Sequence, residues 1–502
     1  MRYESTRGSK IFQSSTKAII RGIAEDKGLY VPEEIPALPL SIEEMKGMTY
    51  QQIAYKVLHT YFDEFSDEEM AYCIDGAYDS KFEAAEVAPM KKAGGAYFLE
   101  LYHGKTAAFK DMALSILPYL MTTSCKKEGE TDKICILTAT SGDTGKAALE
   151  GFAGVEGTEI IVFYPENGVS QVQERQMVSQ AEPNTHVFAI KGNFDDAQTG
   201  VKKIFADDEM KAKLADKGIK LSSANSINIG RLVPQVAYYV YSYVKLVEMG
   251  ALKNGEPMNV VVPTGNFGNI LAAYMAGKMG VPVGKLICAS NENKVLTDFI
   301  RTGVYDARRD FHLTNSPSMD ILISSNLERL IYLLAERDGE AVSRWMTALD
   351  QEKVYEVSDS VKEGLKNFYG GFCTEEETLD AIGKMWSDEK YLMDTHTAVA
   401  YKVYKDYVAE TGDETPTVIA STASAYKFAE SVAKGIGLDE TKVKILAGVT
   451  DKATGFDYVK ALAKETGVKV PLGLKDLELK PVVHNNVCEK AEMPEVVLGA
   501  LK

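Results

Sequence analysis

One lysine of this chain stands among small and apolar residues. Lys110 follows two alanines and Phe109, and an apolar helical run over 112–120 comes after it. Burial would lower the pKa of such an amine, and a neutral amine can attack a carbonyl group to form an imine. Taken alone, a lysine in this setting is more often a solvated helix residue. Lys110 is therefore a candidate Schiff-base residue that needs support from elsewhere in the chain.

Three predicted strands end in loops rich in glycine or hydroxyl side chains. The first loop spans 137–145 and offers the hydroxyls of Thr140, Ser141 and Thr144. Two glycines in it permit a tight turn, and a helix is expected from Lys146. The first turn of a helix has free N–H groups and a positive dipole end, which together favour a carboxylate or a phosphate. Such a loop also serves as an ordinary strand-to-helix turn.

The second loop, 262–269, contains Gly265 and Gly268 and opens a predicted helix over 270–280. Its spacing matches neither the P-loop nor the dinucleotide fingerprint, which disfavours a nucleotide-binding protein. The third loop, 419–424, is rich in hydroxyl groups. Each of these loops alone is as well explained by a turn without a ligand. Together with one reactive lysine they match the needs of pyridoxal phosphate: a Schiff-base amine, a phosphate cup and a partner for the ring nitrogen.

The elements around these loops indicate an α/β fold. Short β-branched runs alternate with amphipathic segments such as 194–217 and 228–249. This alternation predicts a largely parallel sheet with helices on both faces, and ligands in such sheets bind at the carboxyl ends of strands. The predicted strands are 134–137, 160–163, 187–190, 260–262, 286–288 and 417–420.

The pattern of predicted secondary structure changes near residue 93. Residues 1–92 carry helical patterns with many acidic side chains, and we expect them to form an N-terminal helical unit. Residues 93–502 carry the strand–helix alternation and all the candidate chemistry. Within them, the stretch from about 297 to 393 is mainly helical in pattern and is interpreted as an insertion or cover.

Composition excludes several classes of function. The 502 residues carry 56 basic and 72 acidic side chains, a net charge of −16, which repels nucleic acid and anionic membranes. The six cysteines are scattered, which indicates reduced thiols in the cytoplasm and neither a disulfide framework nor a zinc site. We expect no metal and no membrane partner. Either a monomer or a homodimer is compatible with the sequence.

Several motifs, in the same order along the chain, make it resemble the threonine synthase family. That family belongs to the fold type II pyridoxal-phosphate enzymes, which are similar to the tryptophan synthase β-subunit. The resemblance covers almost the whole length. The residues that carry it are 3–8 with 28–32, 103–111, 141–145, 192–198, 225–231 and 265–269.

The resemblance implies a role for each matching position. Lys110 would carry pyridoxal 5'-phosphate as a Schiff base, and Thr422 would contact the pyridine nitrogen, while His103 and Asp111 would order the lysine loop. The cofactor phosphate would be held by the run Gly265, Asn266, Phe267, Gly268 and Asn269. The substrate would be bound by Thr140, Ser141, Thr144, Asn225, Ser226, Asn228 and Arg231.

The implied reaction is the conversion of O-phospho-L-homoserine and water to L-threonine and phosphate. Another lyase of the same fold, acting on a phosphorylated amino alcohol or a hydroxy amino acid, and a non-catalytic homologue remain alternatives. The chain departs from the family pattern at Lys105, Thr395 and Ser424. These positions affect the substrate loops more than the cofactor core.

Overall fold

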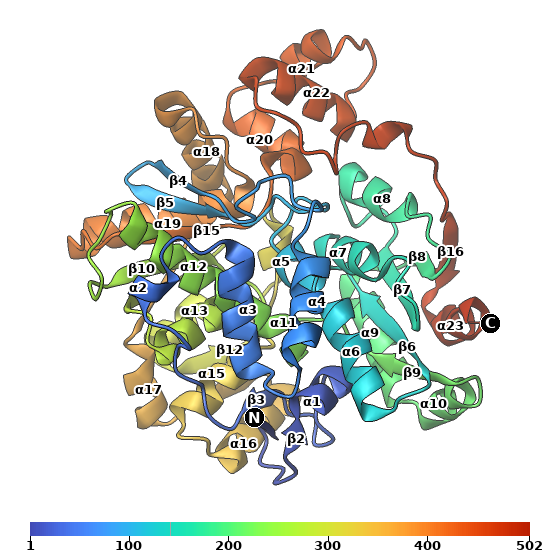
Figure 1. The fold of residues 1–502 in the computed structure, drawn as a ribbon. Coiled ribbons are helices and arrows are strands. Elements are labelled where there is room, and N and C mark those ends of the chain that lie inside the picture. The colour runs from blue at the N-terminus through green and yellow to red at the C-terminus, as the bar shows by residue number, and fades with distance from the viewer. Residues whose placement is uncertain (141, 502) are drawn as a thin grey trace.

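Two sheets of mainly parallel strands frame the protein in the computed structural model, which describes residues 1–140 and 142–501 (Figure 1). In the six-stranded sheet every neighbouring pair is parallel except the antiparallel edge pair β4–β5. Its strands, in spatial order, are β14 (Phe368–Phe372), β11 (Val283–Ser290), β10 (Met258–Pro263), β15 (Thr417–Ser421), β5 (Ala96–Glu100) and β4 (Met90–Ala93).

The second sheet has five strands, and all its pairs are parallel. It lies beside the first sheet in Figure 1. The connections between the two sheets come from parts of the chain that are far apart in the sequence. Its strands, in spatial order, are β16 (Asn486–Glu489), β8 (Thr185–Lys191), β7 (Thr158–Pro165), β6 (Lys133–Ala139) and β9 (Ile219–Ser222).

Helices cover both faces of each sheet because alternate side chains of a buried strand point to opposite faces. In β10, Val260 and Val262 belong to the core that contains α12 (Pro234–Glu248) and α13 (Gly268–Met279). Val261 belongs to the core on the other face, under α19 (Thr395–Thr411). The helices that flank the five-stranded sheet are α6 (Leu117–Glu128), α7 (Asp143–Phe152), α8 (Gln171–Val178), α9 (Phe194–Ala206), α10 (Asp208–Ala215) and α23 (Met493–Ala500).

The N-terminal residues form four helices and a small three-stranded sheet. Tyr3 and Ile53 from this region share one buried core with Tyr239 of α12, so the region packs directly on the helices that cover the six-stranded sheet. The elements are β1 (Arg2–Ser5), β2 (Gln13–Ser14), α1 (Ser15–Arg21), β3 (Tyr30–Pro32), α2 (Ile42–Met45), α3 (Tyr50–Tyr61) and α4 (Asp67–Ala77).

The remaining helices, short strands and 3-10 turns lie between and after the elements named so far. They are α5 (Asp111–Leu114), α11 (Ile229–Leu232), α14 (Val295–Thr302), β12 (Val304–Asp306), the 3-10 turn η1 (Pro317–Met319), α15 (Leu327–Leu334), α16 (Gly339–Glu352), β13 (Val354–Glu356), α17 (Asp359–Leu365), α18 (Glu375–Glu389), η2 (Ala425–Phe428), α20 (Ala429–Gly435), α21 (Glu440–Ala447), α22 (Gly455–Thr466), η3 (Leu477–Leu479) and η4 (Lys490–Glu492).

The α/β class and all six predicted strands are confirmed, as β6, β7, β8, β10, β11 and β15. The predicted helix starts differ slightly: α7 begins at Asp143 instead of Lys146, and α13 at Gly268 instead of residue 270. The expected boundary at residue 92 falls inside β4, and the stretch 297–393 contributes β14 to the six-stranded sheet. That stretch is therefore continuous with the main sheet as well as mainly helical.

Candidate functional site

The lysine loop is tied to the carboxyl end of β15. The backbone N–H of Phe109 donates to the carbonyl of Thr422 (2.8 Å), and the N–H of Ser424 donates to the carbonyl of Ala107 (3.0 Å). Lys110 directly precedes α5, and 9% of its side chain is exposed. The loop is also ordered from within, since Asp111 accepts hydrogen bonds from the N–H (2.8 Å) and the hydroxyl (2.6 Å) of Thr106. Lys110 is thus buried at the edge of the sheet where the hydroxyl-rich loop ends.

Charged side chains surround the Lys110 amine. Its Nζ lies 3.4 Å from Oδ2 of Asp143 and 3.3 Å from Oγ of Ser318. Burial lowers the pKa of Lys110, the Asp143 carboxylate partly opposes this, and the nearby cations Arg231 and Lys427 lower the pKa further. The net effect favours the neutral amine, which is the form that reacts with carbonyl groups.

Asp143 joins two buried lysines. Its Oδ1 accepts from Nζ of Lys427 at 2.8 Å, and no part of the Lys427 side chain is exposed. Burial alone would raise the pKa of Asp143, but the charges of Lys427 and Lys110 outweigh it and hold that pKa well below its usual range. Gln173 also donates to Oδ1, at 2.9 Å. Asp143 therefore stays ionised beside the candidate reactive amine.

The second glycine loop connects β10 to α13 and is shaped to admit an anion. Phe267 takes a left-handed conformation (φ 63°), and α13 begins directly after it. The N–H groups of the first helical turn have no partners within the helix and lie at its positive end. A Cβ at Gly265 would lie 2.5 Å from the carbonyl oxygen of Ser318, so only glycine fits at this position without displacing the loop that carries Ser318.

Asn269, in the first turn of α13, holds an unused donor. Its Oδ1 accepts from the hydroxyl of Tyr238 (2.9 Å) and from that of Tyr239. Its buried Nδ2 has no hydrogen-bond partner in the described part of the chain. A buried donor left unpaired is costly unless a ligand satisfies it.

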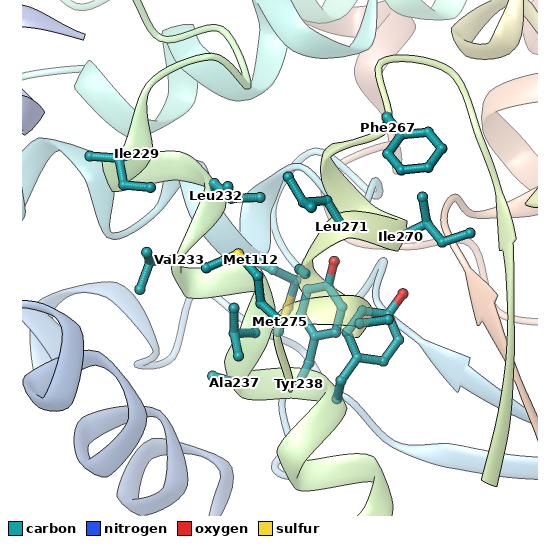
Figure 2. Close-up of a cluster of buried hydrophobic side chains, with 14 of the residues drawn as sticks. Met112, Ile229, Leu232, Val233, Ala237, Tyr238, Phe267, Ile270, Leu271 and Met275 are labelled. Carbon is teal, nitrogen blue, oxygen red and sulfur yellow. The ribbon is translucent and has the colours of Figure 1, made fainter. Parts of the chain in front are cut away.

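The hydrophobic cluster of Figure 2 fixes this loop relative to the lysine. Ile270, Leu271 and Met275 of α13 pack with Tyr238 of α12, and Met112, two residues after Lys110, lies in the same cluster (Figure 2). These side chains are fully or almost fully buried. The lysine helix and the glycine loop are thus anchored to one rigid core, which holds a site more precisely than free loops would.

Three of the predicted substrate residues lie in the segment 225–231, and one of them, Ser226, contacts the glycine loop. Ser226 lies next to Gly268, and its Oγ accepts from Nδ2 of Asn326 at 3.0 Å. Asn225 accepts from the hydroxyl of Thr138 at 3.2 Å. Arg231 donates to the carbonyl of Ala224 (2.7 Å), and burial lowers its pKa to about 10. No carboxylate of the described residues forms a salt bridge with Arg231.

Two other predicted substrate residues, Thr140 and Asn228, form hydrogen bonds with the backbone. The Thr140 hydroxyl accepts from the N–H groups of Gly142 (2.9 Å) and Gly145 (2.8 Å), so it shapes the turn into α7. Asn228 is fully buried, and its amide bonds the backbone of residues 19, 223 and 230. Thr144 lies half-buried in the first turn of α7, while Ser141 is outside the described residues. Substrate roles for these four residues stay predictions.

The residues present fit pyridoxal phosphate. A buried primary amine, a glycine cradle, free helix N–H groups and the unpaired Nδ2 of Asn269 supply what its aldehyde and phosphate require. The buried Arg231 guanidinium, which has no carboxylate partner among the described residues, adds a positive charge that an anionic ligand would neutralise.

Among the described residues, no group of three or more His, Cys, Asp or Glu side chains is arranged to hold a metal ion. No helix of the described chain is long and apolar enough to cross a bilayer.

Sequence reasoning missed Asp143, Ser318 and Lys427. A signal for Lys427 existed, because it stands among alanine and aromatic residues directly after a hydroxyl-rich strand end, as Lys110 stands in its own loop. Asp143 stands between two glycines of the candidate anion loop, where an acidic residue gives no sign of an ion pair with distant lysines. Ser318 carries no local signal, since it reaches the site through a turn that lies far from the lysine in the sequence.

Comparison with protein families covers most of the chain. Residues 2–78 match the model described as threonine synthase N terminus, residues 86–423 that of pyridoxal-phosphate dependent enzymes, and residues 397–469 that of the threonine synthase C-terminal region. The chain is 40% identical to the threonine synthase-like 1 protein of Homo sapiens over 443 residues, which is 85% of this chain. It spans 58% of the length of that relative.

Other relatives match over nearly their full length. The threonine synthase of Pseudomonas aeruginosa is 38% identical, with 87% of this chain and 91% of the relative covered. Among solved structures, the pyridoxal-phosphate-bound threonine synthase of Brucella melitensis superposes with a TM-score of 0.86 at 33% identity, covering 100% of both chains. The yeast threonine synthase superposes with a TM-score of 0.86 at 31% identity, covering 100% of this chain and 98% of the other.

Proposed function

Because the chain belongs to the threonine synthase family of pyridoxal-phosphate-dependent enzymes, we propose that it converts O-phospho-L-homoserine and water to L-threonine and phosphate. The observation that carries the proposal is the Lys110 amine, which is buried where the lysine loop meets the loop after β15, beside Ser318, whose carbonyl packs on Gly265 of the loop after β10. We place this activity in the cytoplasm, on a monomer or homodimer.

Lys110 is the proposed attachment point of the cofactor. When bound, pyridoxal phosphate supplies an aldehyde for amines and a conjugated ring that accepts electron density from the α-carbon of the substrate. The loop 265–269 would hold its phosphate through the free N–H groups of α13 and the Nδ2 of Asn269. Thr422, buried at the end of β15, is the proposed partner of the ring nitrogen.

Lys110 is also the proposed general base. Its lowered pKa leaves a larger share of the amine neutral near pH 7, which is the form that takes a proton from the α-carbon. Asp143, held ionised between Lys110 and Lys427, then lies beside the ammonium that proton uptake creates. This fixed carboxylate stabilises the protonated amine and lowers the barrier to the transfer.

Departure of the substrate phosphate develops the largest negative charge in the reaction. Arg231 carries a buried cation without a carboxylate partner among the described residues, so its charge is available to a ligand. Asn225 and Ser226 add polar groups beside it. Donors that are already in place cost no rearrangement when the charge appears.

The test compares the wild-type protein with Lys110→Ala after incubation with pyridoxal phosphate. We expect the wild type to show visible absorbance, to yield a borohydride-trapped peptide at Lys110, and to release phosphate and threonine in equal amounts from O-phospho-L-homoserine. Lys110→Ala should lose all three signals. Lys133→Ala is the control and should keep all three, because Lys133 is half-exposed at the start of β6, away from the carboxyl ends of the strands, and pairs with Glu159 (3.2 Å).

Three outcomes would contradict the proposal. Normal phosphate release by Lys110→Ala would show that another group does the chemistry. Phosphate release without threonine, or turnover only of phosphorylated amino alcohols or hydroxy amino acids, would identify a different lyase of the same fold. Cofactor binding without any turnover would identify a non-catalytic homologue.

A further inference from the structure

Ser318 brings a hydroxyl group to the reactive amine from a distant part of the chain. It lies in the turn η1, between β12 and α15. Its Oγ is 3.3 Å from Nζ of Lys110 and donates to Oδ2 of Asp143 at 3.3 Å. Because Nζ and Oδ2 are themselves 3.4 Å apart, the amine nitrogen, the carboxylate oxygen and the hydroxyl oxygen form a nearly equilateral triangle.

This triangle fixes the direction of the amine. A neutral lysine amine has two N–H bonds and one lone pair. The Asp143 carboxylate accepts one N–H bond and the Ser318 hydroxyl oxygen accepts the other. Once both N–H bonds and the Cε bond are fixed, only one direction remains for the lone pair. A reactive group held in one orientation gains rate, because misplacement by about 1 Å can cost about 100-fold.

Ser318 is itself held by a buried pair on α19. Its backbone N–H donates to Nε2 of His396 at 3.1 Å, and Nδ1 of His396 lies 2.7 Å from Oδ2 of Asp394. Since Nε2 accepts a hydrogen bond, Nδ1 carries the proton and donates it to Asp394. His396 is 3% exposed and Asp394 is fully buried. Asp394 also accepts from the N–H of Thr397, which ties the pair to the first turn of α19.

A third contact limits Ser318 from the opposite side. The carbonyl oxygen of Ser318 packs directly against Gly265, where any Cβ would approach within 2.5 Å. The backbone of Ser318 is therefore held between α19 and the proposed phosphate loop, while its hydroxyl faces Lys110. A chain of contacts from Asp394 to Lys110 thus crosses elements separated by nearly 300 residues.

We propose that Ser318 is a further catalytic residue, whose hydroxyl orients the Lys110 amine, and that Asp394 and His396 are positioning residues acting through Ser318. The inference rests on the proposed function only in taking Lys110 as the reacting amine. Ser318→Ala should lower kcat roughly 10- to 100-fold and change KM less than about 3-fold, because it affects orientation more than binding. Ser318→Thr keeps the hydroxyl and should retain a rate within about 3-fold of the wild type.

A second readout needs no turnover. When pyridoxal phosphate is added to the cofactor-free protein, the rate at which visible absorbance appears reports attack by the Lys110 amine. Ser318→Ala should slow this step by about 10-fold or more, and Ser318→Thr should restore it. If the wild type condenses with the cofactor but makes no threonine, the proposed function fails while this comparison still tests Ser318.

The double variant separates positioning from general structure. His396→Leu alone should slow both steps about as much as Ser318→Ala, and adding it to Ser318→Ala should cause no further loss. His484→Leu is the control, since His484 is half-buried and its ring bonds the carbonyl of Gln180 (2.8 Å), a residue that the site does not use. Its two rates should equal those of the wild type.

Wild-type condensation and kcat in Ser318→Ala would overturn the role of Ser318. Losses that multiply in the Ser318→Ala/His396→Leu double variant would overturn the positioning role of His396. Failure of Ser318→Thr to restore the rate would show that packing, and not the hydroxyl, is what matters at this position.

Discussion

Removal of Lys427 would leave the buried Asp143 carboxylate without its closest cation. The pair is 2.8 Å apart, with 0% of the lysine side chain and 4% of the aspartate side chain exposed. Breaking a buried pair by deleting one partner typically costs about 3–5 kcal/mol. Here Asp143 keeps Gln173 at 2.9 Å and Lys110 at 3.4 Å, so Lys427→Met should lower the free energy of unfolding by about 3 kcal/mol, the lower end of that range.

The assay is urea unfolding of the cofactor-free protein, carried out on a double-mutant cycle. Asp143→Asn should also destabilise the protein, because it leaves Lys427 as a buried cation without a counter-charge. The Lys427→Met/Asp143→Asn double variant should lose less than the sum of the two single losses, by about 2 kcal/mol or more. Lys434→Met is the control: Lys434 lies one helix later, is 54% exposed and pairs with Glu430, so its loss should stay below about 1 kcal/mol.

The pH dependence of the unfolding free energy tests the same ion pair. The folded pKa of Asp143 is depressed, so its contribution to stability is present above its unfolded pKa of about 3.9 and is lost as the pH falls. Lys427→Met should weaken this loss in acid, because the variant has less stabilisation to lose. Additive losses in the cycle, together with an unchanged acid profile, would refute the coupling between these two residues.

Two other side chains give independent predictions. Asn269→Ala removes the unpaired Nδ2 donor and should weaken pyridoxal phosphate binding by about 10-fold, measured by absorbance titration; an unchanged affinity would exclude Asn269 from the phosphate site. Burial raises the pKa of Asp111 to about 6, so the folded state holds a proton that the unfolded state releases near pH 4, and stability should fall as the pH rises between these values. Asp111→Asn should flatten that fall in urea midpoints taken from pH 4 to 7, and an unaltered slope would contradict the assignment.

The parallel strands were predictable because their β-branched runs are local and continuous. Val260, Val261 and Val262 identify β10 from sequence, and both faces of that strand prove to be buried. β14 was missed because Gly370 and Gly371 interrupt its apolar run, although it pairs with β11 along its whole length. Pairing partners of this kind are decided by distant residues, which local patterns do not encode.

The candidate site was predictable where chemistry and backbone coincide in one segment. Lys110 and the run 265–269 each sit in a loop whose composition indicates its use. Ser318 and His396 were not predictable in this way, because each acts on the site through a contact with a residue far away in the sequence. Asn228 shows another limit: its motif predicts a substrate ligand, and the motif gives no sign of the hydrogen bonds that its amide makes with the backbone.

The place of β15 in the six-stranded sheet bears on how the chain reaches its native state during synthesis. β15 is hydrogen-bonded to β10 on one side and to β5 on the other, yet residue 417 leaves the ribosome long after both neighbours. Until then those two strands have open edges, which invite pairing with other chains. A nascent chain that stops short of this strand would therefore be prone to aggregation, because both edges would stay open.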